Sequence, residues 1–172
     1  IHIPFCRQAC LYCNFHFSTS LRFKNDLINA LLKEIALTPF YNDDDVIETV
    51  YFGGGTPSLL PAAQIETVLD ALQRKFTISD TAEITLEANP DDISAPQLTT
   101  WRKMGINRLS IGIQSFFEED LRWMNRAHHA EQSVNSIHQA QEAGFDDLTI
   151  DLIYGSPGLS DKKWEQNIRK AI

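Results

Sequence analysis

Residues 46–72 read VIETVYFGGGTPSLLPAAQIETVLDAL, and this stretch contains one complete unit of strand, turn and helix. Its first seven residues are mainly β-branched or aromatic, which is typical of a strand. Three glycines and a proline then interrupt the run, and Pro61 stands where a helix begins. Apolar side chains recur after it at helical spacing, at Ile65, Val68, Leu69 and Leu72. The stretch therefore predicts a strand followed by an amphipathic helix.

The same unit repeats along the rest of the chain. Further strands are expected at residues 1–5, 83–88, 108–114 and 148–154. Helices are expected at residues 23–37, 94–104, 118–124, 133–143 and 160–172. Ser94 with Gln97 predicts a capping box, and Ser160 predicts a second helix start. Strands that alternate with helices predict parallel βαβ units, so the expected fold class is α/β: a partial (β/α) barrel of about five units, with outer helices.

Composition narrows the classes of function. The chain has 172 residues, 43% of them hydrophobic and 22% charged, which suits one globular domain. A net charge of −8 argues against nucleic acid and anionic lipid as partners. No apolar run is long enough to be a transmembrane segment and no export signal is visible, so a cytoplasmic location is expected. Three successive acids at Asp43, Asp44 and Asp45 are expected to form a solvated turn.

The chain has three cysteines, and all of them fall in one short segment as Cys6, Cys10 and Cys13. Such a CxxxCxxC cluster favours metal ligation over disulfides. Three thiolates without a fourth suit a [4Fe-4S] cluster with one iron left open to an outside ligand. Two alternatives stay open at this point: a zinc site completed by His2 or His16, and a purely structural trio of buried thiols.

Side-chain alternation places three polar residues on the inner face of the predicted sheet. Successive strand residues point to opposite faces, so Glu87, Gln114 and Asp151 are opposite the apolar residues that meet the helices. All three lie toward the C-terminal ends of their strands, where α/β folds bind ligands. The glycine turn at 53–55 opens at the same edge. It lacks the lysine of a phosphate loop and the spacing of a dinucleotide loop, so it predicts close backbone approach to another kind of ligand.

Several ordered blocks of sequence together resemble one known family. They are His2-Ile3-Pro4-Phe5-Cys6, the CxxxCxxC segment, Tyr51-Phe52-Gly53-Gly54-Gly55-Thr56-Pro57, Leu86-Glu87-Ala88-Asn89-Pro90, Ser110-Ile111-Gly112-Ile113-Gln114-Ser115-Phe116 and Asp151-Leu152-Ile153-Tyr154-Gly155. The chain resembles radical S-adenosylmethionine (SAM) enzymes, in particular the oxygen-independent coproporphyrinogen III oxidases and their heme chaperone relatives. On this resemblance, residues 1–172 are expected to form one radical SAM core domain, truncated at both ends and lacking the C-terminal region of the family.

The resemblance also implies the ligands and the residues that hold them. Cys6, Cys10 and Cys13 would hold a [4Fe-4S] cluster, whose fourth iron is chelated by the amino and carboxylate groups of SAM. In the family, the reduced cluster passes an electron to the sulfonium and releases a 5′-deoxyadenosyl radical. The implied SAM-binding residues are Tyr12, Gly54, Gly55, Thr56, Glu87, Gln114, Arg126 and Asp151. Of these, Arg126 taken by itself is interpreted as a surface arginine after a helix.

One residue bears on the branch of the family. The oxidases carry a further cysteine two residues after the third, where this chain has Phe15, whereas the heme chaperone branch has an aromatic residue there. Asn14 replaces the aspartate that this branch usually carries. The resemblance therefore favours a protein that binds heme and transfers it to acceptor hemoproteins. The alternative is oxidative decarboxylation of coproporphyrinogen III to protoporphyrinogen IX. Whether the protein is an enzyme is left open, because SAM cleavage is compatible with the motifs while Phe15 argues against coproporphyrinogen dehydrogenase activity.

The resemblance implies partners as well. They are SAM, heme or a porphyrinogen, acceptor hemoproteins, and a reductant protein such as flavodoxin or ferredoxin. His128 and His129 are candidate axial heme ligands, but a solvated pair of histidines after a helix is the favoured interpretation of these two residues.

Overall fold

A computed structural model describes residues 1–39 and 46–172, so the expected turn at Asp43, Asp44 and Asp45 lies outside the described residues. Its centre is one five-stranded sheet in which every neighbouring pair of strands is parallel. The strands follow one another across the sheet in chain order: β1 (His2–Ile3), β2 (Val46–Gly54), β3 (Thr77–Ala88), β4 (Arg108–Gln114) and β5 (Asp147–Leu152). The expected α/β fold with five parallel strands is confirmed.

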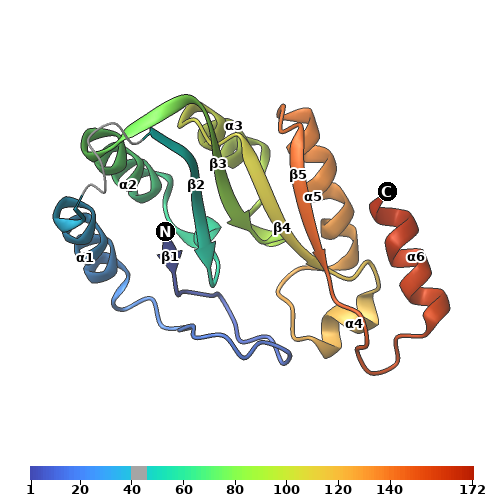
Figure 1. The fold of residues 1–172 in the computed structure, drawn as a ribbon. Helices are drawn as coiled ribbons and strands as arrows, with labels where there is room; N and C mark the ends of the chain where they lie inside the picture. The colour runs from blue at the N-terminus through green and yellow to red at the C-terminus, as the bar shows by residue number, and fades with distance from the viewer. Residues whose placement is uncertain (40–45) are drawn as a thin grey trace.

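Helices connect the strands and lie outside the curved sheet (Figure 1). The α-helices are α1 (Lys24–Leu37), α2 (Ala62–Lys75), α3 (Ala95–Lys103), α4 (Glu118–Trp123), α5 (Ala130–Glu142) and α6 (Asp161–Ala171). Two short 3₁₀ turns, η1 (Pro57–Leu59) and η2 (Pro90–Asp92), follow β2 and β3. Because the strands are parallel, both turns and the loop between β1 and α1 lie at the same edge of the sheet (Figure 1).

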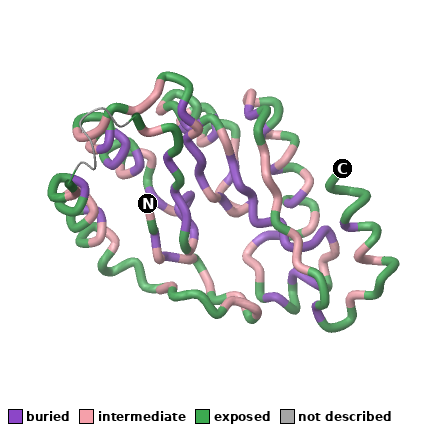
Figure 2. Tube along the Cα trace, viewed as in Figure 1, coloured by how far each residue is buried: buried purple, intermediate pink, exposed green. Residues whose placement is uncertain are grey.

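The hydrophobic core lies between the outer face of the sheet and the helices. The apolar residues of β3 and β4 that were expected to meet the helices are buried: Ile84, Leu86, Ala88, Leu109, Ile111 and Ile113. The predicted face of α2 is buried against them. In Figure 2 the buried colour concentrates along the central strands, and the outer helix faces are exposed. The apolar residues of β5 are only partly buried, because β5 is at the edge of the sheet.

Several predicted boundaries differ from the structure. β1 is limited to His2–Ile3, and β3 begins six residues earlier than expected because Thr77 already pairs with Val46. Ser94 stands at the start of α3 but makes no capping hydrogen bond, so the predicted capping box is absent. Ser160 caps α6 as predicted, since its hydroxyl accepts the backbone N–H of Lys163.

A layer of polar side chains covers the inner face of the sheet below its C-terminal edge. The guanidinium of Arg108 on β4 donates to the hydroxyls of Thr85 on β3 and Thr149 on β5. It also lies 3.5 Å from a carboxylate oxygen of Glu83 and 3.4 Å from one of Asp147. The inner face is therefore polar at its base as well as at its mouth, as the alternation predicted.

No helix in the described part of the chain is both long and apolar enough to cross a membrane.

Candidate functional site

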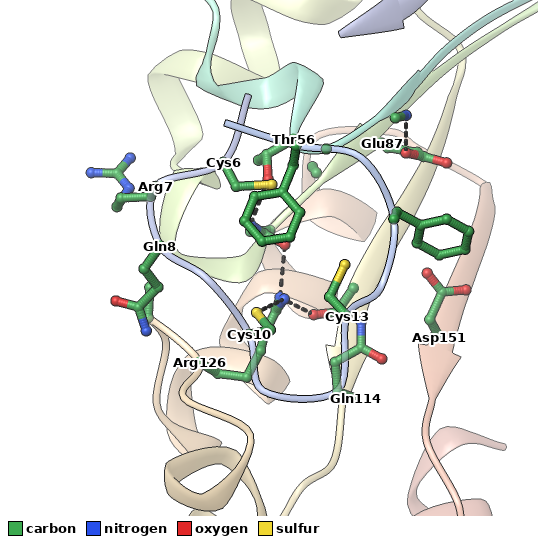
Figure 3. Close-up of a pocket in the computed structure, with 18 of the residues that line it drawn as sticks. Cys6, Arg7, Gln8, Cys10, Cys13, Thr56, Glu87, Gln114, Arg126 and Asp151 are labelled. Atoms are coloured by element: carbon green, nitrogen blue, oxygen red, sulfur yellow. Dashed lines mark hydrogen bonds between the residues drawn. The ribbon is translucent and has the colours of Figure 1, made fainter. Parts of the chain in front are cut away.

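One pocket at the C-terminal edge of the strands contains the three cysteines and every residue that the family resemblance implied for SAM binding, but not His2, His16, His128 or His129. Its lining includes the three cysteines and Tyr12 from the loop after β1, Gly54 at the end of β2, and Gly55 and Thr56 from the loop that follows. Glu87, Gln114 and Asp151 enter it from the inner faces of β3, β4 and β5, and Arg126 from the loop after α4. Figure 3 shows these side chains around the ring formed by the cysteine loop. Six separate segments of the chain thus meet in one place.

The cysteine loop is held open by backbone hydrogen bonds at its base and on one side. Cys6 N–H donates to the carbonyl of Ser18 at 3.1 Å, and Ser18 N–H donates to that of Pro4 at 2.8 Å. On the side toward α4, Leu11 N–H donates to the carbonyl of Met124 at 3.0 Å. The side-chain amide of Asn125 donates to the carbonyl of Ala9 at 2.7 Å. All three thiols are free and partly exposed. The loop therefore presents three unpaired thiols to the pocket.

The glycine turn lets the second loop approach the cysteine loop closely. Gly55 N–H donates to the carbonyl of Ile3 at 2.8 Å. A Cβ at Gly55 would lie 2.7 Å from the carbonyl oxygen of Phe5 and 2.9 Å from Cys6 Sγ, closer than real Cβ contacts. Gly54 has φ +122°, a conformation that L side chains rarely adopt. Both glycines are required by this packing, which explains their place in the motif.

Glu87 fixes the glycine turn from the neighbouring strand. One carboxylate oxygen accepts the backbone N–H of Gly54 at 3.0 Å, and the other accepts the hydroxyl of Tyr51 at 2.8 Å. Burial, followed by this contact with Glu87, raises the pKa of Tyr51, so the phenol is the donor. Glu87 therefore connects β2 and β3 at the rim of the pocket.

Arg126 is the polar centre of the site, and its interpretation as a surface arginine is wrong. One guanidinium nitrogen lies 3.5 Å from Cys10 Sγ and 3.2 Å from the hydroxyl of Tyr12. The other donates to the side chain of Asn89 at 2.7 Å and to the carbonyl of Gly112 at 2.8 Å. Asn89 in turn donates to the hydroxyl of Thr56 at 3.2 Å. Arg126 thus joins the cysteine loop, β4 and the loop after β3.

Gln114 and Asp151 complete the wall of the pocket. Gln114 is 8% exposed and has φ 67°, which is uncommon for a residue other than glycine and marks a constrained position. It stands where the register between β4 and β5 shifts. Burial raises the pKa of Asp151, while the positive charge of Arg126 acts in the opposite direction. The wall therefore offers a carboxamide and a partly buried carboxyl group to a polar ligand.

The favoured interpretation of His128 and His129 as a solvated pair holds for one of them. The side chain of His129 is exposed, and its Nδ1 lies 2.9 Å from Glu118. His128 is only 2% exposed, and its Nε2 lies 3.2 Å from the carbonyl oxygen of Ile113. His128 therefore joins the Arg126 loop to β4 next to Gln114. The chain turns inward here because Asn125 adopts φ 55°.

Acidification is expected to weaken the fold through His128. Burial, with the nearby charge of Arg126, lowers the pKa of His128 to about 4, from 6.5 in an unfolded chain. Between these pH values the unfolded state binds a proton that the folded state does not, so stability falls as the pH falls. The loss from pH 7 to pH 4 is expected to be about 3 kcal/mol. Urea unfolding across this range should show the loss in the wild type and in an exposed control, His129→Gln. A His128→Gln variant with an unchanged pH slope would contradict this assignment.

The pocket fits an iron–sulfur cluster in its donor chemistry. Its ligands are three thiols on one loop, and Arg126 lies beside one of them to balance the negative charge of a thiolate cluster. Among the described residues, no three His, Cys, Asp or Glu side chains converge in the way the ligands of a single metal ion do. The pKa of the Cys6 thiol is raised above its usual value, because the effect of burial exceeds the opposing effect of a hydrogen bond with Thr56. A metal bound to the sulfur would therefore have to favour the thiolate.

Comparison with known proteins identifies the family. The model of the radical SAM superfamily matches residues 1–171. The chain belongs to the radical SAM superfamily. Membership implies a [4Fe-4S] cluster and SAM, the two cofactors that the family resemblance implied.

Two curated relatives of this radical SAM chain are named heme chaperone HemW. The protein from Bacillus subtilis (strain 168) is 36% identical, and that from Escherichia coli (strain K12) is 35% identical. Each alignment covers 100% of this chain and 46% of the relative, so the chain spans about half their length.

A solved structure extends the likeness of this radical SAM chain to the oxidase branch. The coproporphyrinogen III oxidase HemN from Escherichia coli superposes with a TM-score of 0.89 at 33% identity. The match covers 99% of this chain and 40% of that one. It supports the partial-barrel architecture.

Sequence reasoning missed several residues of the pocket. Asn89 belongs to the motif at residues 86–90, but its role as an acceptor for Arg126 could be recognised only once Arg126 was placed beside it. Gly112 belongs to the motif at residues 110–116. A Cβ at this position would lie 3.0 Å from the side-chain nitrogen of Gln114 and 3.3 Å from a guanidinium nitrogen of Arg126. The missed signal was the glycine inside a strand, which often marks close approach of another group.

Proposed function

We propose that Cys6, Cys10 and Cys13 ligate the [4Fe-4S] cluster through their thiolates and that SAM chelates the fourth iron through its amino and carboxylate groups. The support is the open ring of three free thiols beside a polar pocket. On this proposal residues 1–172 act as one radical SAM core domain. When bound, the cluster and SAM supply one-electron chemistry at the sulfonium.

The remaining pocket residues are proposed to hold SAM. Gly54, Gly55 and Thr56 contact its methionine end, where the absence of side chains on the two glycines leaves backbone groups accessible. Tyr12 and Arg126 flank the cluster side of the ligand. Glu87, Gln114 and Asp151 bind the rest from the strand ends, and their polar groups suit an amine and hydroxyls.

The whole protein is proposed to be a heme chaperone that binds heme and delivers it to hemoproteins. The observation that carries this proposal is Phe15, which lines the pocket mouth and is 78% exposed where the oxidases have a further cysteine. Residues 1–172 offer no other thiol in its place, because they contain three cysteines in all. The names of the two HemW relatives support the same branch.

A second candidate function is oxidative decarboxylation of coproporphyrinogen III, favoured by the close likeness to HemN. Radical chemistry at this site would need a reductant for the cluster, such as flavodoxin or ferredoxin. The cytoplasm, as a reducing compartment, suits both functions and the free thiols.

Assays of the full-length protein, reconstituted anaerobically with iron and sulfide, distinguish these two functions. We expect it to bind hemin, seen as a change in the hemin absorption spectrum, and to pass it to an apo-hemoprotein. We expect no decarboxylation when coproporphyrinogen III, SAM and a reductant are supplied. A Phe15→Cys variant tests whether the missing thiol alone accounts for the absence of decarboxylation.

The opposite result would favour the oxidase. Efficient formation of protoporphyrinogen IX together with 5′-deoxyadenosine, and no hemin binding, would overturn the chaperone proposal. A colourless protein that contains zinc and no acid-labile sulfide would overturn the cluster itself.

A further inference from the structure

A single buried carboxylate connects three of the loops that form the pocket. Asp92 lies in η2, after β3, and its side chain is 5% exposed. One of its oxygens accepts from Arg7, which stands between the first two cysteines. The other accepts from the hydroxyl of Ser58 at 2.7 Å, and Ser58 lies in η1 directly after the glycine turn. The cysteine loop and the glycine turn are thus fixed to the same side chain.

Arg7 makes this connection through two nitrogens on one edge of its guanidinium. Its Nη2 contacts Asp92, and its Nε lies 3.2 Å from the neighbouring Asp91. Both carboxylates are largely buried, with side chains 13% and 5% exposed, so they need a cation close by. A planar guanidinium bonds two adjacent acceptors in a way that the ammonium of a lysine does not. Burial and the second carboxylate raise the pKa of Asp91, which also shows how closely the two acids are packed.

The residue after Arg7 is held from the opposite side. The side-chain amide of Gln8 donates to the carbonyl of Asn125, and the side chain of Asn125 donates to that of Ala9 at 2.7 Å. The segment from Cys6 to Cys10 is therefore held between η2 on one side and the Arg126 loop on the other. Neither contact includes a thiol, so both are available before any cluster is bound. Figure 3 shows Arg7 and Gln8 directed outward from the ring of the cysteine loop.

We propose that Arg7 and Asp92 are positioning residues that hold the cysteine loop in its cluster-binding conformation before the cluster arrives. They act through Cys6 and Cys10, and the side chain of Arg7 is directed away from the ring of the cysteine loop (Figure 3). Through Ser58 the same contact keeps the glycine turn in register with the cysteine loop, so the cluster site and the SAM site are assembled together. This inference rests on the proposed cluster site.

An ordinary surface ion pair would not have this effect. Exposed pairs contribute little, because water and salt screen them. The pair of Arg122 with Glu118 on α4 is of that kind, with Arg122 77% exposed. The pair of Arg7 with Asp92 differs because one partner is buried and its second oxygen is already bonded to Ser58. Loss of Arg7 therefore leaves a buried carboxylate without its cation, and the local backbone must open to hydrate it.

Hydrogen exchange of the cluster-free protein tests the proposal directly. Arg7→Gln and Asp92→Asn are each expected to raise the exchange rate of residues 6–13 about tenfold, as local opening becomes easier. The effects of the two changes in the double variant should be less than additive, because both remove the same contact between Arg7 and Asp92. Arg7→Lys should restore only part of the protection. Arg122→Gln is the matched control and should leave exchange in residues 6–13 unchanged.

The reconstituted protein gives a second readout. Iron is expected to be lost to a chelator about tenfold faster from both single variants than from the wild type, as for other residues that orient ligands. Unchanged exchange of residues 6–13 in Arg7→Gln, or additive effects in the double variant, would overturn the proposal. If Asp92→Asn fails to fold, Arg7→Gln alone decides, since its side chain is half exposed. Should the wild type bind no iron, the cluster proposal fails while exchange in the cluster-free protein still decides whether the loop is held by Arg7.

Discussion

Serine in place of any one of Cys6, Cys10 and Cys13 is expected to abolish the iron–sulfur cluster. Residues 1–172 contain no fourth cysteine, so no other thiol within them can replace the lost one. A serine hydroxyl at neutral pH stays protonated and is a poor ligand for iron, whereas cluster ligands are thiolates. Iron content after anaerobic reconstitution should fall from about four atoms per chain to less than about one. SAM affinity should fall with it, because the iron that chelates SAM is lost.

The cluster-free fold should survive these changes. The three thiols are partly exposed, and the loop is also held by backbone groups of Cys6 and Leu11 and by the side chains of Arg7 and Gln8, which the substitutions leave in place. Circular dichroism and the thermal midpoint of the unreconstituted variants should therefore match the wild type. Ser20→Ala, on the same exposed segment, is the control and should retain full iron content. A single cysteine variant with the iron content of the wild type would show that this residue is not a ligand.

The parts of the fold that the sequence predicted are those that depend on local periodicity. The alternation in β3 and β4 placed Leu86 and Ile111 toward the helices and Glu87 toward the pocket, because neighbouring side chains of a strand must point to opposite faces. The parallel topology then followed from the order of strands and helices. The same reasoning put the cysteine loop and the glycine turn at one edge of the sheet, since both follow parallel strands.

Periodicity could not place residues whose position depends on loops and distant partners. Arg126 enters the pocket because Asn125 turns the backbone with φ 55° and because Asn89 and Gly112 accept its guanidinium. These partners are far away in sequence, so no local pattern announces the contact. His128 is buried for the same reason, although two adjacent histidines after a helix are typical of a solvated segment. Only the family resemblance named Arg126 in advance.

Alanine in place of Gly55 is expected to impair cluster binding with little other effect on the fold. Its Cβ would meet the carbonyl oxygen of Phe5 at 2.7 Å and Cys6 Sγ at 2.9 Å, and neither contact is the mobile end of a long side chain. β1 cannot move away without stretching the 2.8 Å hydrogen bond from Gly55 N–H to Ile3. The clash must therefore displace Cys6. We expect a loss of about 2 kcal/mol in the free energy of unfolding, as for other overpacked sites, and iron affinity about 10–100-fold weaker.

Gly158→Ala separates the two consequences of the Gly55 substitution. A Cβ at Gly158 meets nothing within 4 Å, but its φ of +84° makes alanine strained by about 1–2 kcal/mol. The two variants should therefore lose comparable stability in urea unfolding, and only Gly55→Ala should lose iron. If both retain iron equally, the close contact between the glycine turn and Cys6 is not needed for cluster binding. If iron is lost only in Gly55→Ala, the glycine of this turn is required because it leaves room for a cysteine ligand of the neighbouring loop.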